Sequence, residues 1–295
     1  MIISASRRTD IPALYARWLI NRVRAGFCLV PNPFNPRQIS RVDLTPAQVD
    51  VIVFWTRNPQ PLQPHLRELD ARGYRYYFQY TLLGYPRAIE PYSPPLEAAV
   101  ENFHRLAAEI GAEKVIWRYD PILLTPLTDV VYHQEMYQQI AELLRGATRR
   151  SVISFVSAYP KLASRLRALA EKGYVLGEEQ FAHQAHRLVS FIVDTARQND
   201  MQVFSCAEQH DLKLDGLLPG KCIDDTYIAN VFGIRVGNRK DPSQRPACGC
   251  VVSKDIGMYD TCSFGCQYCY AVSSVSAAQK RHKMHDPDAP ILIPG

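Results

Sequence analysis

The chain has 295 residues, of which 47% are hydrophobic and 21% charged, and this composition excludes fibrous and wholly disordered proteins. The net charge of +5 permits an acidic partner such as nucleic acid but does not require one. No apolar run reaches the roughly 18 residues that a membrane span needs, and the N-terminal arginines follow too short an apolar segment for a secretory signal. We therefore expect a cytoplasmic protein without a membrane partner.

Short apolar, β-branched runs alternate with amphipathic stretches from the N-terminus to about residue 205. The amphipathic stretches carry apolar residues three and four positions apart, as at Phe103, Leu106 and Ile110. In chain order, the pattern predicts strands at 2–5, 27–30, 51–55, 74–81, 114–119, 151–156 and 201–205. It predicts helices at 61–72, 95–110, 130–145, 160–172 and 178–199.

Strands that alternate with helices of this length indicate βα units and a parallel sheet. Six or seven such units favour a TIM-like β/α barrel, complete or partial. An open doubly wound sheet is the alternative, although no glycine-rich phosphate loop follows the first strand. We expect residues 1–205 to form the barrel body and residues 206–295 to form a Cys-rich region that completes it within one structural domain.

The cysteines are distributed unevenly along the chain. Of the eight, Cys28 stands alone in an apolar run and is interpreted as a packed structural thiol. The other seven lie in the last 90 residues: Cys206, Cys222, Cys248, Cys250, Cys262, Cys266 and Cys269. A disulfide framework would not leave the first 205 residues almost bare, and cytosolic thiols stay reduced. The distribution predicts metal or redox chemistry in the C-terminal third.

The last three cysteines form the pattern C-x3-C-x2-C, with Tyr268 directly before the third. Three thiolates on one tight loop can hold three irons of a cubane cluster and leave the fourth iron open to an exogenous ligand. A zinc loop or buried structural cysteines are the alternatives, but zinc loops more often use C-x2-C pairs. We therefore interpret Cys262, Cys266 and Cys269 as ligands of a [4Fe-4S] cluster.

This loop resembles the signature of the radical S-adenosylmethionine (SAM) superfamily. The resemblance implies that the open iron binds the amino and carboxylate groups of SAM and that reductive cleavage yields a 5′-deoxyadenosyl radical. It also implies a reducing partner such as flavodoxin or ferredoxin. Tyr268, Arg7 and Arg8 are the further candidates for cofactor binding. The glycine-glycine-glutamate stretch that commonly binds SAM in the superfamily is not evident here.

The loop of the superfamily usually follows the first barrel strand, whereas here it follows residues 251–257 near the end of the chain. This order resembles a circular permutation of the barrel. The whole chain resembles a conserved bacterial family of unknown function, through residues 4–12, 54–59 and the cysteine region from 248 to 271. A more distant likeness to spore photoproduct lyase is carried by residues 118–122.

A second group consists of Cys206, Cys222, Cys248 and Cys250. Four thiolates from separate loops, one pair being C-x-C, can fill the corners of a second [4Fe-4S] cluster. They can equally form a four-thiolate zinc site or remain unligated. His210 is an alternative ligand for this group.

Polar residues follow the predicted strands, where a parallel barrel collects its binding and catalytic groups. Arg57, Arg118 and Asp120 are the candidate catalytic residues, and Arg7 and Arg8 follow the first strand. Together the arginines predict a mouth that binds a carboxylate or phosphate. The alternative for each is an ion pair with a nearby acid, such as Asp120.

Taken together, these patterns predict a radical SAM-like enzyme that acts on an unidentified, anionic small molecule. A nucleic-acid repair or modification enzyme of the same chemistry is the first alternative. The second is a binding protein stabilised by zinc or a cluster, without SAM chemistry.

Overall fold

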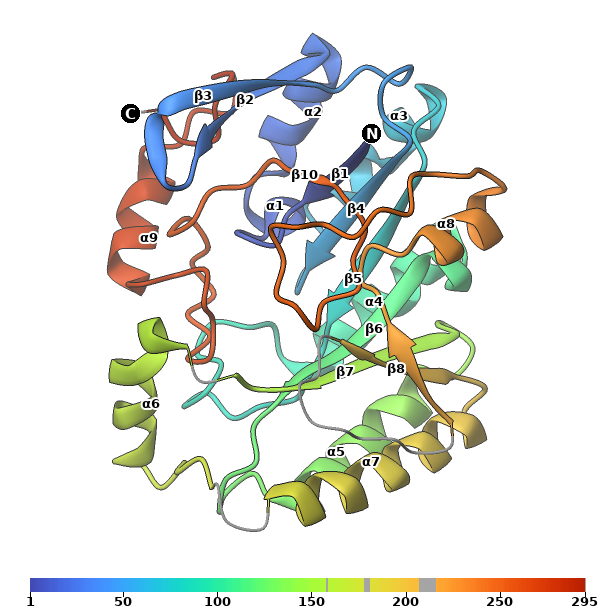
Figure 1. Cartoon of the computed structure of the whole chain (residues 1–295), viewed down its shortest axis with the longest axis vertical. Coiled ribbons are helices and arrows are strands. Elements are labelled where there is room, and N and C mark those ends of the chain that lie inside the picture. Colours follow the sequence, from blue (N-terminus) through green and yellow to red (C-terminus); the bar gives the residue numbers. More distant parts are fainter. Residues whose placement is uncertain (158, 178–180, 207–215, 295) are drawn as a thin grey trace.

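The computed structural model describes residues 1–157, 159–177, 181–206 and 216–294. Its centre is one eight-stranded sheet in which every neighbouring pair is parallel (Figure 1). In spatial order the strands are β10 (Lys254–Asp255), β1 (Ile2–Ala5), β4 (Val51–Thr56), β5 (Tyr76–Thr81), β6 (Val115–Ile122), β7 (Arg150–Phe155), β8 (Gln202–Cys206) and β9 (Leu217–Gly220). The predicted parallel α/β sheet is confirmed, but the strands described do not close into a barrel, because β10 and β9 stand at its two edges.

Helices flank the sheet, as the alternation of patterns predicts. They are α1 (Ile11–Leu14), α2 (Ala16–Ala25), α3 (Leu66–Ala71), α4 (Leu96–Ile110), α5 (Val130–Leu143), α6 (Ala163–Ala170), α7 (Phe181–Gln198), α8 (Asp225–Phe232) and α9 (Val275–Lys283). Short 3-10 turns cover Gln63–His65, Ala112–Lys114 and Pro160–Leu162. Figure 1 shows α5 and α7 side by side below the sheet. Within the described residues, no helix has both the length and the apolar character that crossing a bilayer requires.

The two faces of the sheet have different coverings, because successive side chains of a strand point to opposite sides. Phe54, Phe78 and Trp117 belong to the larger core, which includes residues of the flanking helices. Residues of the opposite face pack against Cys222, Ile223, Cys248, Cys250 and Val251. The segments around residues 222–223 and 248–251 therefore cover this second face, called the inner face below, whereas Cys266 and Tyr268 pack in the larger core.

A hairpin stands apart from this sheet. The strand expected at 27–30 exists as β2 (Phe27–Asn32), but it pairs antiparallel with β3 (Asn35–Asp43). The C-terminal tail lies beside it, and Leu29 donates its backbone N–H to the carbonyl of Pro290 at 2.8 Å.

The first strand of the chain, β1, lies beside β10, which belongs to the C-terminal part of the chain. Ile3 pairs with Lys254 and Ser4 with Asp255 in a parallel register, so β10 lies directly beside β1. The strand expected at 251–257 is present as the two residues of β10, and the loop of the last three cysteines follows it. The segment after β9 and the segment before β10 are joined by a hydrogen bond from the Val251 N–H to the Ile223 carbonyl, at 3.1 Å.

Candidate functional site

The three-cysteine loop, residues 262–269, lies at the carboxyl end of β10 and is fixed by its backbone. Gln267 donates its backbone N–H to the Ile89 carbonyl at 3.0 Å, and Cys269 donates its own to the Cys266 carbonyl at 3.1 Å. Gly265 has a φ of +73°, and a Cβ there would lie 3.0 Å from Pro91 and Tyr92. The loop therefore needs glycine both for its turn and for its close approach to residues 91–92.

Arg165 of α6 holds the same loop from the other side. Its guanidinium donates to the carbonyl of Cys266 at 3.2 Å and to that of Cys269 at 2.5 Å. Cys266 is buried and Cys262 and Cys269 are half-buried, and all eight cysteines of the chain are free. Burial raises the pKa of Cys266 to about 12, against the opposing effect of the Arg57 charge. Burial likewise raises the pKa of Cys262 and Cys269.

Tyr268 connects the loop to a buried ion pair. Its hydroxyl donates to the carboxylate of Glu90 and accepts from Arg57. Arg57 and Glu90 themselves form a salt bridge at 2.8 Å, with 11% and 4% of their side chains exposed. Both line a cavity of about 240 Å³ whose wall also includes Tyr85 and Ser93. The candidate cofactor residue Tyr268 and the candidate catalytic residue Arg57 thus belong to one group beside the loop.

The donor set of this loop fits an iron–sulfur cluster. Its three thiols lie within eight residues, and the charges of Cys266 and Cys269 help burial to raise the pKa of Cys262. In the described part of the chain, no group of three or more His, Cys, Asp or Glu side chains is arranged to hold a single metal ion. A cubane takes each cysteine on a different iron, so its ligands do not converge on one point.

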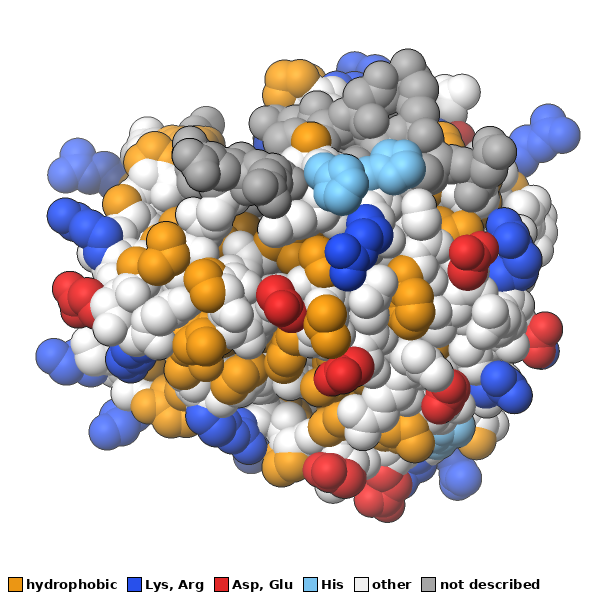
Figure 2. All heavy atoms as spheres, turned by 90° about the horizontal axis from the view of Figure 1, so that it is seen from below, with side chains coloured by type: hydrophobic (Ala, Val, Ile, Leu, Met, Phe, Trp, Pro, Cys, Tyr) orange, Lys and Arg blue, Asp and Glu red, His pale blue; other side chains and the backbone are white. Residues whose placement is uncertain are grey.

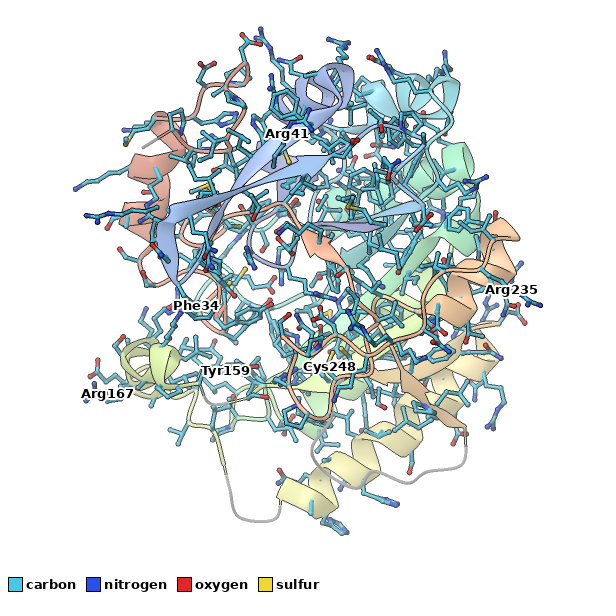
Figure 3. All side chains as sticks on the ribbon, turned by 45° about the horizontal axis from the view of Figure 1, so that its top comes forward. Phe34, Arg41, Tyr159, Arg167, Arg235 and Cys248 are labelled. Carbon is cyan, nitrogen blue, oxygen red and sulfur yellow. The ribbon has the colours of Figure 1, made fainter. Side chains whose placement is uncertain are left out.

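The second cysteine group comes together on the inner face of the sheet. Cys206 ends β8 and Cys222 follows β9, and their sulfurs lie 2.9 Å apart. The thiol of Cys250 lies close enough to those of Cys222 and Cys248 for each of them to affect its pKa through a hydrogen bond. These bonds lower the pKa of Cys250 and raise that of Cys248. Figure 3 shows Cys248 near the middle of the molecule, on a loop that lies over the sheet.

Arg118 and Asp120, at the end of β6, lie beside this second group. Arg118 donates to the Cys222 sulfur at 2.8 Å and forms an ion pair with Asp120. Its guanidinium carbon lies 5.0 Å from the Trp55 ring centroid, and that of Arg7 lies 5.7 Å from the same ring. The structure therefore brings Arg7 and Arg118 together, next to the second cysteine group.

The other two arginines lie elsewhere. Arg57 belongs to the group of Glu90 and Tyr268, and the Arg8 guanidinium lies 5.4 Å from the ring centroid of Tyr259. The four arginines predicted to share one mouth are thus divided between several sites. Three of them form ion pairs: Arg118 with Asp120, Arg57 with Glu90, and Arg7 with Asp241, the last at 3.9 Å. Ion pairing with a nearby acid is the alternative that the sequence left open for each arginine. His210 lies outside the described residues.

The model of a domain of unknown function, DUF1848, matches residues 2–271, which include both cysteine groups. The chain belongs to this family. The expected membership of a conserved family of unknown function is therefore confirmed. No curated protein matches the chain. A chain from Bacteroides thetaiotaomicron VPI-5482, provisionally assigned as an alpha-L-fucosidase, is 11% identical, with 81% of this chain and 83% of that chain covered. Its TM-score of 0.31 is too low to support any inference about fold or activity.

The sequence did not predict three residues that position the sites of this DUF1848 chain. Glu90 and Arg165 lie in segments without a motif and act on a loop more than 100 residues away. Asp255 ends β10 and accepts from Ser4, Ser6 and Arg7 at 2.7–2.9 Å. Asp255 lies near the carboxyl end of the strand expected at 251–257, so a search of that strand end for acids would have found it.

Proposed function

We propose that this protein is a radical SAM-like enzyme, in which Cys262, Cys266 and Cys269 hold a [4Fe-4S] cluster. When bound, the cluster would supply the electron that cleaves SAM reductively and starts radical chemistry on a substrate. A reducing partner of the flavodoxin or ferredoxin type would restore that electron. The observation that carries this proposal is the C-x3-C-x2-C loop itself, buried at the carboxyl end of a parallel strand.

The position of the loop in the sheet supports the proposal. Ligand sites of parallel α/β sheets collect at the carboxyl ends of the strands. β10 leads into the loop and pairs with β1, which is the arrangement that a permuted barrel requires. We propose that the sheet is a partial β/α barrel whose cluster-bearing unit stands last in the chain instead of first.

The residues around the loop suit the binding of SAM. Glu90 offers a carboxylate to an ammonium group and Arg57 a guanidinium to a carboxylate, and an α-amino acid carries both. Tyr268 ties this pair to the loop, because its hydroxyl bonds to both side chains. The burial of Glu90 and Arg57 keeps water from the pair, as radical chemistry requires.

The substrate in this proposal is a small anion. The Nη2 atom of Arg7 and the Nε1 atom of Trp55 are buried and have no hydrogen-bond partner among the described residues. Both atoms are donors, so a ligand that meets them must carry acceptors such as carboxylate or phosphate oxygens. Arg7 lies near both cysteine groups. The hydroxyl of Tyr270, which follows Cys269 directly, donates to the Arg7 carbonyl at 3.1 Å, and the Arg7 guanidinium lies over the Trp55 ring beside Arg118, which donates to Cys222. Substrate bound there would face both groups.

The nucleic-acid alternative receives less support. The face in Figure 2 carries Asp and Glu side chains as well as Lys and Arg, and its basic side chains do not form a continuous stripe. A backbone-binding face for nucleic acid gathers basic residues on one surface. This face therefore gives no support to a nucleic-acid substrate, and we propose the small anion on the strength of the unpartnered donors of Arg7 and Trp55.

The test begins with protein purified without oxygen. A brown protein with a broad absorption shoulder near 400 nm, and iron and sulfide in equal amounts, is expected for clusters. Addition of SAM to the reduced protein should change its low-temperature electron paramagnetic resonance spectrum. In the variant with Cys262, Cys266 and Cys269 all changed to alanine, SAM should change nothing. The matched control is Cys28→Ala, since Cys28 is also a buried thiol but lies far from both groups along the sequence. A colourless parent protein would contradict the proposal and favour the zinc-stabilised binding protein.

A further inference from the structure

The second cysteine group has the features of a buried metal centre. Its members come from three separate segments: the end of β8, the residues after β9 and the loop before β10. Cys222, Cys248 and Cys250 are only 3%, 7% and 2% exposed. Cys28 is equally buried, but it packs in the larger core and not with these thiols. Four thiols gathered in one place are difficult to explain by packing alone, because each buries a polarizable group that packs no better than alanine or valine.

Hydrogen-bond donors point at the sulfurs of this group. The Arg118 guanidinium donates to Cys222 at 2.8 Å, and the Ile223 backbone N–H donates to Cys250 at 3.4 Å. A neutral thiol is a weak acceptor, whereas a metal-bound thiolate is a strong one. Donors to ligand sulfurs are also the usual surroundings of thiolate-bound metals.

The local charges suit an anionic centre. Four thiolates with a +2 core, either Zn²⁺ or an oxidised [4Fe-4S] cluster, carry a net charge of −2. Arg118 donates to the Cys222 sulfur at 2.8 Å, and the guanidinium of Arg7 lies over the same Trp55 ring as that of Arg118, so two cationic groups stand near the sulfurs. A buried charge needs such compensation.

The backbone around the group is closely packed. Gly249 separates Cys248 from Cys250, and a Cβ there would lie 3.2 Å from the Lys221 side chain. The carbonyl of Cys222 accepts bonds from the Tyr77 hydroxyl and the Gln79 amide, both at 2.8 Å. These contacts fix the segment after β9 onto the inner face of β5, with the thiols between it and the loop 248–250.

From these contacts we infer that Cys206, Cys222, Cys248 and Cys250 together bind a second, all-thiolate metal centre, separate from the three-cysteine loop. The metal is thiophilic, either the irons of a [4Fe-4S] cluster or, once the thiols have moved apart, a single zinc ion, because the described side chains are not arranged to hold one ion as they stand. The sulfurs of Cys206 and Cys222 are 2.9 Å apart, closer than the roughly 3.8 Å expected for two thiolates on one tetrahedral zinc with bonds of about 2.3 Å. Binding of either metal therefore separates these two thiols. The inference does not depend on SAM chemistry.

The experiment isolates the second centre in a variant that lacks the first. Iron, zinc and acid-labile sulfide per chain are measured in the parent, in the Cys262→Ala, Cys266→Ala, Cys269→Ala variant and in Cys28→Ala, all purified without oxygen. The triple variant should keep the second centre, with about four irons and four sulfides or with about one zinc. Its X-ray absorption spectrum distinguishes the two, since a zinc site has sulfur neighbours only and a cluster also has iron neighbours.

The reciprocal variant is Cys248→Ala with Cys250→Ala. It should lose the same amount of metal that the triple variant keeps, while Cys28→Ala should retain the parent content. Because the double variant could also lose metal by failing to fold, the triple variant gives the decisive reading. A triple variant without stoichiometric metal, or with a Cys206–Cys222 disulfide in reduced preparations, would overturn the inference. If the triple variant holds metal but the parent never cleaves SAM, the second centre stands and the proposed function fails.

Discussion

Asp255, the last residue of β10, accepts a hydrogen bond from the hydroxyl of Ser6 at 2.7 Å, although 249 residues separate the two in the chain. The same carboxylate accepts from Ser4 at 2.9 Å, from the Arg7 backbone N–H at 2.8 Å and from the Gly257 backbone N–H at 2.9 Å. A Cβ on Gly257 would lie 2.0 Å from the Ser6 hydroxyl oxygen, so this junction accepts only glycine there. One carboxylate thus joins the start of the chain to the strand that leads into the three-cysteine loop.

Removal of that carboxylate should loosen both the edge of the sheet and the loop. We expect Asp255→Ala to lower the free energy of unfolding by about 3 kcal/mol, because it leaves several partly buried donors unpaired. Urea denaturation measures the loss. The matched control is Asp194→Ala, which removes an exposed ion pair with Arg197 and should cost less than about 0.5 kcal/mol. Equal losses in both variants would contradict the role of Asp255.

Gly265 tests the shape of the three-cysteine loop. Gly265→Ala should destabilise the loop and reduce its iron content, because the left-handed turn is strained and the new methyl group meets Pro91 and Tyr92. Gly73→Ala supplies the control, since Gly73 also has a positive φ but no atom within 4 Å of the added carbon. The control should cost about 1 kcal/mol and keep its iron. Unchanged iron in Gly265→Ala would show that the loop tolerates a side chain.

The ion pair of Arg57 and Glu90 should behave as one unit. Arg57→Leu or Glu90→Leu alone should each destabilise the protein by about 3–5 kcal/mol, because each leaves a buried charge without its partner. The double variant should lose clearly less than the sum of the two, and urea denaturation of all four proteins measures this coupling. Glu101 and Arg105 form an exposed pair on α4 and should couple by only about 0.5 kcal/mol. Additive losses at Arg57 and Glu90 would contradict their pairing.

His133 predicts a pH dependence of stability. It is fully buried, Tyr119 bonds to its Nδ1 at 2.7 Å, and the Leu123 carbonyl bonds to its Nε2 at 2.9 Å. Burial lowers the pKa of His133 to about 4, against the opposing effects of its hydrogen bond to Leu123 and of the Asp129 charge. The His133 side chain therefore takes up a proton near pH 6.5 in the unfolded chain, but only near pH 4 in the folded chain.

It follows that His133 lowers stability as the pH falls. The free energy of unfolding should drop by about 2 kcal/mol from this residue between pH 7 and pH 5. His133→Gln should remove that part of the slope, although it also weakens the protein at neutral pH. The exposed His183, changed to Gln, is the control and should keep the parent slope. Urea denaturation at the two pH values decides, and a slope that His133→Gln leaves intact would contradict the prediction.

The main strands could be predicted because both faces of the sheet are buried. β1 matches its expected range, and β4 to β8 differ from theirs by a few residues at either end. β3 was missed, because most of its side chains are exposed and it shows no apolar run. The helix α8 was missed too, although Asp224 caps its start and Gly233 ends it.

The candidate site could be predicted only in part, for a physical reason. The cysteine groups are visible because their spacing in the sequence reflects the chemistry of their ligands. The partners that position them, such as Glu90 and Arg165, come from other elements, and only the folded chain brings these together. The division of the arginines between separate sites likewise depends on which acid each one meets, which no local pattern encodes.

The most direct test of the account is whether the protein cleaves SAM. Reconstituted, reduced protein is incubated with SAM without oxygen, and 5′-deoxyadenosine is measured by liquid chromatography with mass detection. We expect 5′-deoxyadenosine from the parent and from Cys28→Ala, and none from the variant that lacks Cys262, Cys266 and Cys269. Formation of 5′-deoxyadenosine at the parent rate by that triple variant, or none from a parent with a full complement of iron, would contradict this expectation.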